Sequence, residues 1–218
     1  MINLLIKWLF PPKCMFCGEI SDEGDICRTC AEKAEKFRVS SENRNIKCPC
    51  FKKLDGCQAW FYYADVVRQA VIKAKFHNCH SFISEFTGLI PNDFKDFCSD
   101  NRIDIIAPVP VHKSKFYTME YTLTYEMVKR IAKMYGLDYN IETVKKIKKT
   151  KNQHDLTLSQ RKTNLNGAFE INADVKGKNV LIVDDIVTTG YTLENVAKCL
   201  KKAGAEKVTA VCFAYNRK

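Results

Sequence analysis

Long apolar runs are absent from this sequence of 218 residues. A membrane-spanning helix needs about 20 apolar residues in succession, and the apolar N-terminal segment 1–12 is short and interrupted by Lys7. The segment also lacks a small-residue cleavage site after its apolar run, which argues against a signal peptide. Its simplest interpretation is an amphipathic turn that packs on the body of the protein and stops at Pro11 and Pro12. We therefore expect a cytoplasmic protein without a membrane span.

An excess of acidic residues is also lacking. The chain has 25 Asp and Glu against 35 Lys and Arg, which gives a net charge of +10. This balance favours anionic partners such as nucleic acid, a phosphorylated substrate or lipid headgroups, although lysine-rich surfaces also simply keep proteins in solution. The hydrophobic content of 46% is ordinary for a globular protein. The length leaves room for one α/β domain and a small appendage.

The stretch from Val180 to Leu193, VLIVDDIVTTGYTL, carries the most specific pattern in the chain. Its four apolar residues 180–183 are typical of a strand that is buried on both faces of a parallel sheet. Two aspartates follow, and then come hydroxyl residues, a glycine and the start of an amphipathic helix. Ligands of open α/β sheets bind beyond the carboxyl ends of the strands. The stretch therefore predicts an α/β fold with a binding site after this strand.

The chemistry of this stretch suits a phosphorylated sugar. Hydroxyls, a glycine and the free N–H groups of a helix start form a phosphate cradle. Asp184 and Asp185 suit two neighbouring sugar hydroxyls, or a magnesium ion shared with pyrophosphate. An ordinary buried strand with a helix cap would explain residues 180–183 and one threonine, but not two charged aspartates at a strand end. The pattern predicts a ribose that carries a 5-phosphate.

Seven of the eleven cysteines lie between residues 14 and 57. Two CxxC pairs are separated by nine residues, a spacing that lets four thiolates converge on one zinc ion and supplies folding free energy that a short segment lacks. Without an export signal, disulfides are a poor alternative. A redox role of CxxC stays open, but two paired knuckles favour metal. We predict a structural zinc site formed by Cys14, Cys17, Cys27 and Cys30.

Three more cysteines, Cys48, Cys50 and Cys57, come next. They predict either a second zinc site, completed by His77, Cys79 or His80, or thiols that are merely buried. The remaining three sit in apolar or helical patterns and are expected in the core, namely Cys98, Cys199 and Cys212.

The pattern changes near residue 58. From Trp60 onward the spacing of apolar residues through 67–72 predicts a helix, and 81–97 continues as a helix broken by Pro91. We therefore place a domain boundary there. Residues 1–58 form the apolar segment and the zinc module, and residues 59–218 form the α/β domain.

A second buried strand is predicted within residues 104–111, ending in Pro108-Val109-Pro110. Each proline removes a backbone donor and stiffens the following loop. His112, Lys113 and Lys115 come next, so one anionic and one cationic strand end are available for the two ends of a phosphosugar. Residues 121–135 predict an amphipathic helix. The run 145–151 has five lysines in seven positions, which indicates a solvated face or mobile loop, or else a loop that closes over pyrophosphate or contacts a nucleic-acid backbone.

Together, the CxxC module, PVP, T-x-x-Q, R-x-x-N-x-x-G-A-F and DD-x-x-TTG-x-T resemble the ComF family over roughly residues 10 to 214. These are competence-associated proteins with an N-terminal zinc module and a type I phosphoribosyltransferase domain. The resemblance implies binding of phosphoribosyl pyrophosphate (PRPP) with magnesium, with Val109 in the pyrophosphate loop. It implies that Asp184 and Asp185 hold the ribose hydroxyls. The residues that would wrap the 5-phosphate are Thr188, Thr189, Gly190 and Thr192, and the other matching positions are Pro108, Pro110, Thr150, Gln153, Arg161, Asn164 and Gly167 to Phe169.

The implied reaction is displacement of pyrophosphate from C1 of PRPP by a nucleophile that the sequence does not identify. Asp184 and Asp185 would stabilise positive charge on the ribose, and Arg161 or lysines of 145–151 would neutralise pyrophosphate. One segment departs from the family, because Met119 to Leu123 stands where relatives carry RGFNQ. The departure affects turnover more than PRPP binding, so transfer and sensing of the phosphoribosyl group are both kept as functions in DNA uptake.

The alternative is a non-catalytic scaffold that binds single-stranded DNA and proteins of the competence machinery. The net charge and the aromatic run 60–63 fit a basic groove with stacking platforms. The same aromatics also fit a core between the two domains.

Overall fold

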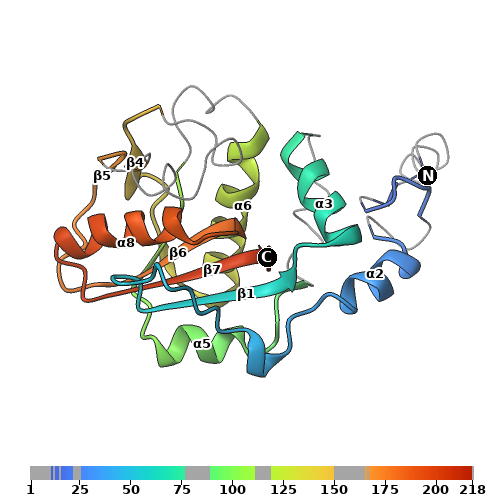
Figure 1. Ribbon diagram of the computed structural model, residues 1–218, viewed down its shortest axis with the longest axis horizontal. Coiled ribbons are helices and arrows are strands. Elements are labelled where there is room, and N and C mark those ends of the chain that lie inside the picture. The colour runs from blue at the N-terminus through green and yellow to red at the C-terminus, as the bar shows by residue number, and fades with distance from the viewer. Residues whose placement is uncertain are drawn as a thin grey trace.

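A five-stranded parallel sheet forms the centre of the protein (Figure 1). The computed structural model describes residues 11, 13–14, 16–21, 26–76, 89–110, 119–149, 165 and 167–217. The strand order is β1-β7-β6-β2-β3, and each neighbouring pair is parallel. This architecture confirms the predicted α/β fold class. The strands are β1 Gly56–Tyr62, β2 Ile105–Pro108, β3 Asp138–Tyr139, β6 Asn179–Val187 and β7 Lys207–Tyr215.

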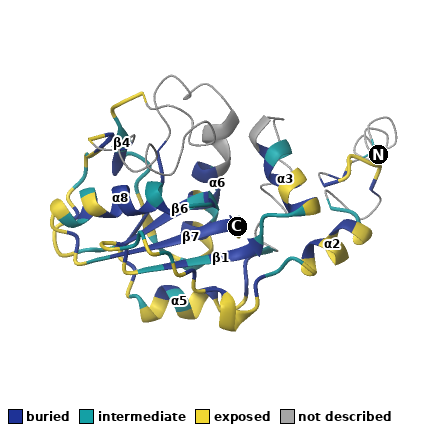
Figure 2. Ribbon diagram, in the orientation of Figure 1, coloured by how far each residue is buried: buried dark blue, intermediate teal, exposed yellow. Residues whose placement is uncertain are grey.

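Both faces of the sheet are buried (Figure 2). In β6, Leu181 and Val183 pack into one apolar cluster, whereas Val180 and Ile182 pack into a second one. This alternation explains why the run is apolar at every position, since adjacent strand residues point to opposite faces. The first cluster includes residues of the helices α3 Asp65–Phe76, α5 Phe94–Asp100 and α6 Met119–Tyr135, and the second includes residues of α8 Tyr191–Lys202.

The connections that follow β2 and β6, which are neighbours in the sheet, lead toward opposite edges of the sheet. From β2 the chain passes through α6 to β3 on one side, and from β6 it passes through α8 to β7 on the other side. Because α6 and α8 contribute to different apolar clusters, they cover opposite faces. Connections that leave two adjacent strands in opposite directions open a crevice at the carboxyl ends of those strands. The fold therefore places its ligand crevice beyond Pro108 and Val187.

A small antiparallel pair lies beside α8. It consists of β4 Val144–Lys146 and β5 Phe169–Ile171, and β5 contacts α8. The first two lysines of the run 145–151 thus belong to a strand, and Ile147 just after it donates its N–H to the carbonyl of Ala168 at 2.9 Å. The strand β4 was not predicted from the sequence, because two of its three residues are lysines and so short a segment shows no apolar alternation.

The cysteine-rich region precedes the sheet and continues into it. It contains the helix α2 Arg28–Glu35 and a single 3₁₀ turn, η1 Ser41–Asn43, before the chain enters β1. The boundary that we predict near residue 58 falls within β1. Across the described parts of the chain, no helix combines the length and the apolar character that crossing a bilayer requires.

Two expected elements differ from the structure. The helical spacing predicted from Trp60 begins only at Asp65, because Trp60 to Tyr62 complete β1. β6 continues four residues beyond Val183, so the aspartates lie inside a strand and not after it. The helices predicted at 121–135 and 94–97 are confirmed within α6 and α5, whereas 81–88 lie outside the described residues.

Candidate functional site

The loop between β6 and α8 has the form predicted for a phosphate cradle. Gly190 is the N-cap residue of α8, adopts φ +72° and makes no side-chain cap hydrogen bond. A Cβ atom at this position would lie 2.5 Å from Cε1 of Phe51. Glycine is therefore required twice, once for the left-handed backbone and once for the close approach of the ring. The ring of Phe51 therefore packs closely against the loop at Gly190.

The start of α8 has no side-chain cap. The first turn of a helix leaves its N–H groups without intrahelical partners, and here no capping side chain takes one. The hydroxyl of Thr189 is buried and has no hydrogen-bond partner. A buried hydroxyl without a partner costs about 1–3 kcal/mol. Such a group, next to an uncapped helix start, fits a loop that binds an anion.

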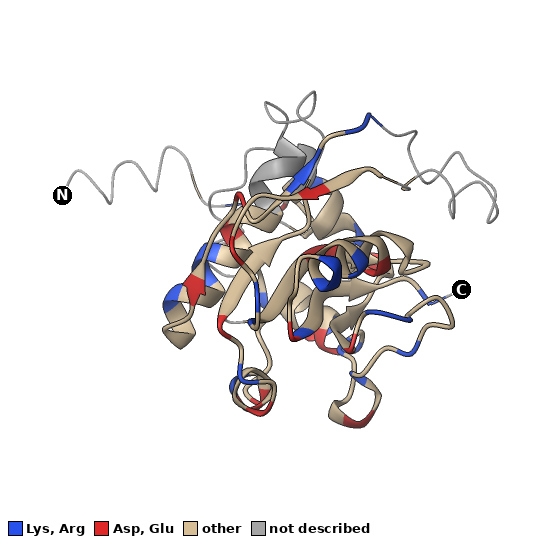
Figure 3. Cartoon of the chain, turned by 90° about the vertical axis from the view of Figure 1, so that its left-hand side faces the viewer, with Lys and Arg blue, Asp and Glu red and all other residues tan. Residues whose placement is uncertain are grey.

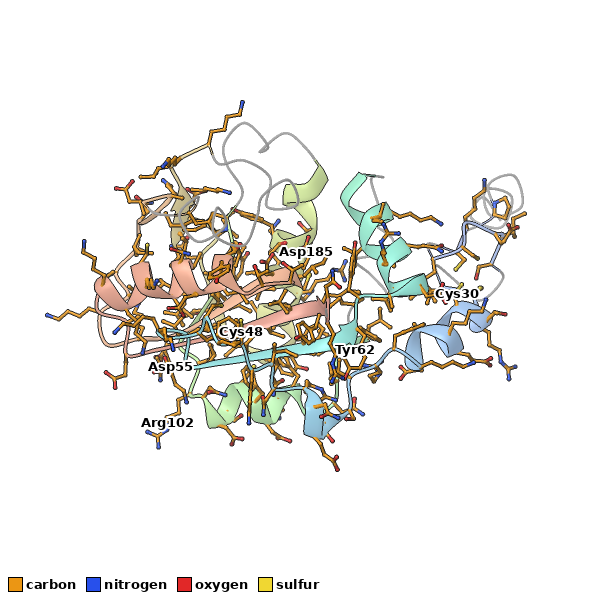
Figure 4. The ribbon with its side chains drawn as sticks, viewed as in Figure 1. Cys30, Cys48, Asp55, Tyr62, Arg102 and Asp185 are labelled. Carbon is orange, nitrogen blue, oxygen red and sulfur yellow. The ribbon has the colours of Figure 1, made fainter. Side chains whose placement is uncertain are left out.

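The two aspartates are adjacent residues of β6 just before this loop, and Figure 4 labels Asp185. Asp184 is half-buried and Asp185 is buried, and the N–H of Asp185 donates to Oδ1 of Asp184 at 2.9 Å. Their negative field reaches the neighbouring strand, where Cys212 is the register partner of Asp184. Burial first of all, then Cys57, and then both aspartates raise the pKa of the Cys212 thiol. The pair therefore forms a region of concentrated negative charge at the carboxyl end of the sheet.

The end of β2 lies directly beside the aspartates. Pro108 is the register partner of Val183, and Val109 donates its N–H to the carbonyl of Val183 at 2.8 Å. The turn that we predict as the pyrophosphate loop is thus adjacent to Asp184 in space, although 75 residues separate β2 from β6 at their first register pair. The structure brings Val109, the two aspartates and the loop 188–190 to one edge.

Several predicted residues fall outside the described parts of the chain. Arg161 is one of them, so its predicted role in neutralising pyrophosphate stays a prediction. The same holds for the matching positions Thr150, Gln153 and Asn164, for the cationic group His112, Lys113 and Lys115, and for His77, Cys79 and His80.

Glu194 is a site residue that the sequence did not reveal. Its carboxylate is buried and accepts hydrogen bonds from the backbone N–H groups of Lys52, Lys53 and Leu54 at 2.8 to 3.2 Å. It ties the segment that follows the cysteine module to the first turn of α8. A glutamate in the first turn of a helix is usually exposed and complements the helix dipole. No pattern in the sequence therefore indicates a contact between Glu194 and the residues 52–54.

Cys48 and Cys50 also reach the loop. Their Sγ atoms lie 3.2 and 3.1 Å from the carbonyl oxygen of Thr189, and 3.0 Å from each other. Both thiols are half-buried. The region 48–54 therefore contacts the loop through two thiols and the ring of Phe51. The buried carboxylate of Glu194 ties the same region to α8.

The four predicted zinc ligands converge as expected. Sγ of each lies within 4.8 Å of the others, and Sγ of Cys17 and of Cys27 are 3.9 Å apart. Burial opposes ionisation of Cys14, but N–H groups of Cys27, Cys17 and Phe16 outweigh it and lower the pKa of that thiol to about 6. Burial and the three neighbouring thiols raise the pKa of Cys30. One centre that favours a thiolate, with its partners close by, fits a zinc ion, whose charge ionises the remaining thiols.

The zinc module packs on the larger domain. Phe16 is fully buried in the same cluster as Val67 and Val71 of α3, and Lys73 of α3 donates to the carbonyl of Phe16 at 2.9 Å. Gly18 makes the turn after the first CxxC pair with φ +89°. The module therefore braces α3.

A second zinc site does not form from the described residues. Within them, only the first four cysteines bring three or more metal-ligating groups together. Cys57 is buried and interacts with Cys212 instead of with the pair at 48 and 50. Cys98 and Cys212 lie in the core as predicted, and Cys199 is partly buried against it.

The aromatic run at the start of the larger domain is largely core. Trp60 and Phe61 are fully buried, and the Trp60 ring meets Phe94 edge to face at 5.2 Å. Tyr62 and Tyr63 are half-buried. Of the two interpretations of this run, the core interpretation is correct for the first two residues, and they are not available for stacking on bases.

Comparison with known proteins gives two domain matches and several relatives. Residues 123–218 match the family model of the phosphoribosyl transferase domain, and residues 5–52 match the double zinc ribbon domain. The chain is similar to the DNA utilization protein YhgH of Salmonella typhi, with 31% identity over 110 residues that cover 50% of this chain and 48% of the relative.

Two further relatives widen the comparison. Competence protein F of Haemophilus influenzae is 28% identical over 108 residues, which cover 48% of this chain and 47% of the relative. The ribose-phosphate pyrophosphokinase of Pyrococcus furiosus is 42% identical over 83 residues, which cover 38% of this chain and 25% of the relative. The match spans about half the length of the YhgH and competence relatives.

Proposed function

Because the chain is a ComF-type protein, in which a double zinc ribbon precedes a phosphoribosyl transferase domain, we propose that it binds PRPP with magnesium in a pathway of DNA uptake or use. The 5-phosphate lies in the loop 188–192, and the ribose hydroxyls contact Asp184 and Asp185. The pyrophosphate lies beside the turn at Val109. The observation that carries the proposal is the buried, partnerless hydroxyl of Thr189 at the uncapped start of α8.

The 5-phosphate supplies what this loop lacks. Phosphate oxygens accept hydrogen bonds from the N–H groups of the first turn of α8 and from hydroxyl groups such as that of Thr189. The partial positive charge of the helix start adds to the attraction. Thr188 and Thr192 flank the same turn, and we assign them to this phosphate as well.

The aspartate pair suits both the ribose and the metal. Adjacent carboxylates offer the oxygen ligands that magnesium prefers, so Asp184 and Asp185 would hold the ion that accompanies PRPP. Bound magnesium would neutralise charge on the pyrophosphate group. The carboxylates themselves orient the ribose and stabilise positive charge that develops on its ring. We assign neutralisation of the leaving pyrophosphate to Arg161 and the lysines of 145–151.

Transfer and sensing of the phosphoribosyl group differ in what happens after binding. In transfer, a nucleophile displaces pyrophosphate at C1. In sensing, the bound ligand only shifts the state of the protein. We favour transfer, with an acceptor that the site does not identify. The names of the relatives, DNA utilization protein and competence protein, support a role in DNA uptake or use. We place the protein in the cytoplasm.

Direct binding of single-stranded DNA is the second partner that we consider. In the cartoon of Figure 3, basic and acidic residues are interspersed along the described parts of the chain, and Trp60 and Phe61 are buried. These observations favour a phosphosugar over a basic groove with stacking aromatics. If DNA binds, its affinity should fall steeply with salt, because binding releases counterions from the phosphates. A salt-insensitive or absent interaction would remove DNA as a direct ligand.

Calorimetric titration with PRPP and magnesium tests the proposal. We expect Asp185→Ala to weaken binding about 10- to 100-fold, which corresponds to the loss of one hydrogen bond to a charged group at roughly 1.5–3 kcal/mol. Asp138→Ala is the matched control, because Asp138 is exposed on the edge strand β3. Equal affinities of wild type and Asp185→Ala would refute the site.

Thr189→Val gives a sharper test, since valine keeps the shape and removes only the hydroxyl. We expect it to weaken PRPP binding and, at the same time, to stabilise the unliganded protein, because the buried hydroxyl then no longer lacks a partner. Release of pyrophosphate in the presence of candidate acceptors would then distinguish transfer from sensing.

A further inference from the structure

Two thiols hold the backbone of the phosphate loop. Cys48 and Cys50 place their Sγ atoms 3.2 and 3.1 Å from the carbonyl oxygen of Thr189. Neither is in a disulfide. A thiol is a donor as well as a weak acceptor, so both can donate to this one carbonyl. The same oxygen thus depends on two sulfur donors that are separated by one residue in the sequence and are adjacent in space.

The carbonyl that they hold sets the direction of a ligand-binding group. In a planar trans peptide, the C=O and N–H bonds point in opposite directions. With the carbonyl of Thr189 directed at the thiols, the N–H of Gly190 points away from them. That N–H belongs to the turn that starts α8. The thiols therefore orient an amide of the phosphate cradle.

The thiols cannot move independently of the loop. Pro49 between them restricts the backbone, and the ring of Phe51 lies where a Cβ of Gly190 would be. Glu194 anchors the next three residues through their N–H groups. A chemical change at the sulfurs is consequently transmitted to the loop and not absorbed by a flexible linker.

One thiol of the pair, that of Cys48, is accessible from outside. Cys48, which Figure 4 labels, lines an open hollow of about 690 Å³ that also includes Lys47, Phe51 and Asp96. This volume admits a small peptide thiol or disulfide. Burial, then Cys48 and then Glu194 raise the pKa of the Cys50 thiol, so Cys50 stays protonated at neutral pH and acts as a donor. Cys48 is the sulfur that a reagent in the hollow meets first.

The sulfurs are also close enough to join. Their separation of 3.0 Å exceeds the length of a disulfide bond by about 1 Å. Among the described residues, no third metal ligand accompanies them. A dithiol that is accessible through Cys48 and adjacent to a binding loop has the arrangement of a thiol–disulfide pair.

We propose that Cys48 and Cys50 form a reversible disulfide that loosens the phosphate loop. The oxidant is a small disulfide of the glutathione class. The Cys48 thiolate attacks one of its sulfurs and releases one thiolate, which takes the proton of Cys50. Cys50 then attacks the Cys48 sulfur and releases the second thiolate, which takes up the proton that Cys48 lost on ionisation. Two thiol hydrogens are transferred, the external disulfide is reduced to two thiols, and one S–S bond forms in the protein. A disulfide has no donor, so the carbonyl of Thr189 loses both hydrogen bonds.

The formation of the disulfide and the loosening of the loop are independent of the ligand, whereas an effect on affinity rests on the proposed function. The experiment therefore reads the loop directly. Zinc-loaded full-length protein is treated with oxidised glutathione, and peptides are mapped by mass spectrometry before and after reduction. Amide hydrogen exchange is measured over 187–193. We expect a Cys48–Cys50 disulfide and about three- to tenfold faster exchange in that peptide, reversed by a reducing thiol.

Two variants separate oxidation from general damage. Cys48→Ser with Cys50→Ser keeps hydroxyl donors but cannot form a disulfide, so exchange at 187–193 should be slow and unaffected by the oxidant. Cys48→Ala with Cys50→Ala removes the donors and should show fast exchange without any oxidant. Cys199→Ser is the matched control and should respond to the oxidant as wild type does. Zinc content is measured in every sample.

Three results would overturn the inference. One is a second zinc ion per chain that the serine variant loses, because the pair would then be a metal site. Another is exchange at 187–193 that is the same in reduced, oxidised and alanine-substituted protein. The third is oxidation that pairs other cysteines and leaves Cys48 and Cys50 reduced. If PRPP binds to none of the samples, the proposed function fails, while these readouts still decide the role of the thiols.

Discussion

Replacing Glu194 with alanine is expected to detach the segment after the cysteine module from α8. The carboxylate is 2% exposed and accepts from three consecutive backbone N–H groups, those of Lys52, Lys53 and Leu54. In the variant these groups lose their common acceptor. Because Phe51 of the same segment contacts Gly190, the loop 188–190 should loosen together with this segment.

The size of the effect follows from the exposure of the three donors. Leu54 is buried, so the loss of its bond to a charged acceptor costs about 1.5–3 kcal/mol. Lys52 and Lys53 are exposed, and water replaces much of what they lose. Lys198 approaches Glu194 only to 4.0 Å and is itself exposed, which adds less than about 0.5 kcal/mol. We therefore expect a total loss of roughly 2–4 kcal/mol in the free energy of unfolding.

Urea denaturation of wild type, Glu194→Ala and Glu194→Gln measures this loss. Glutamine keeps one acceptor oxygen and should lose about half as much as alanine. Glu170→Ala, at an exposed position of β5, serves as the control. Hydrogen exchange over 48–54 should accelerate in the alanine variant and not in the control. A stability of Glu194→Ala within about 0.5 kcal/mol of wild type would refute the role of the carboxylate.

Three further outcomes are expected. Gly190→Ala should cost about 2–4 kcal/mol of stability, because the left-handed backbone and the contact with Phe51 both oppose a Cβ; adding Phe51→Ala should recover only the steric part, and full recovery would contradict the backbone argument. Removal of zinc by a chelator should lower the Tm and speed exchange in α2 and α3, since Phe16 ties the module to Lys73; unchanged α3 exchange would argue against bracing. Burial raises the pKa of Cys98 from 9.0 to about 12, so the stability that this thiol contributes is complete below pH 9 and disappears as the pH rises to about 12. In denaturant titrations, Cys98→Ala should therefore lose less stability than wild type between these two pH values. Parallel losses in the two proteins would contradict this prediction.

The sequence predicted the centre of the site well because that part depends on local chemistry. Val180 to Val183, the aspartate pair and the TTG turn lie in one continuous stretch, and a strand, a loop and a helix start follow from neighbours a few residues apart. The four zinc ligands were found for the same reason, since CxxC pairs form their turns locally.

Contacts across long sequence separations could not be predicted in this way. The thiols of Cys48 and Cys50 reach Thr189 over about 140 residues, and Glu194 reaches Lys52 over a similar distance. Nothing near either partner in the sequence indicates the other. The prediction that a helix begins at Trp60 was wrong for a different reason. A short apolar run fits a buried strand and a helix equally well until its neighbours in the sheet are known.

The pairing of the first strand with the last one has a consequence for synthesis of the chain. Gly56 of β1 lies opposite Thr209 of β7, and β1 occupies the edge of the sheet. While the ribosome is still making the middle of the protein, β1 with its Trp60 and Phe61 has no sheet to join. Closure of this edge must wait until the final strand emerges, so premature termination before residue 207 leaves an apolar segment open to aggregation.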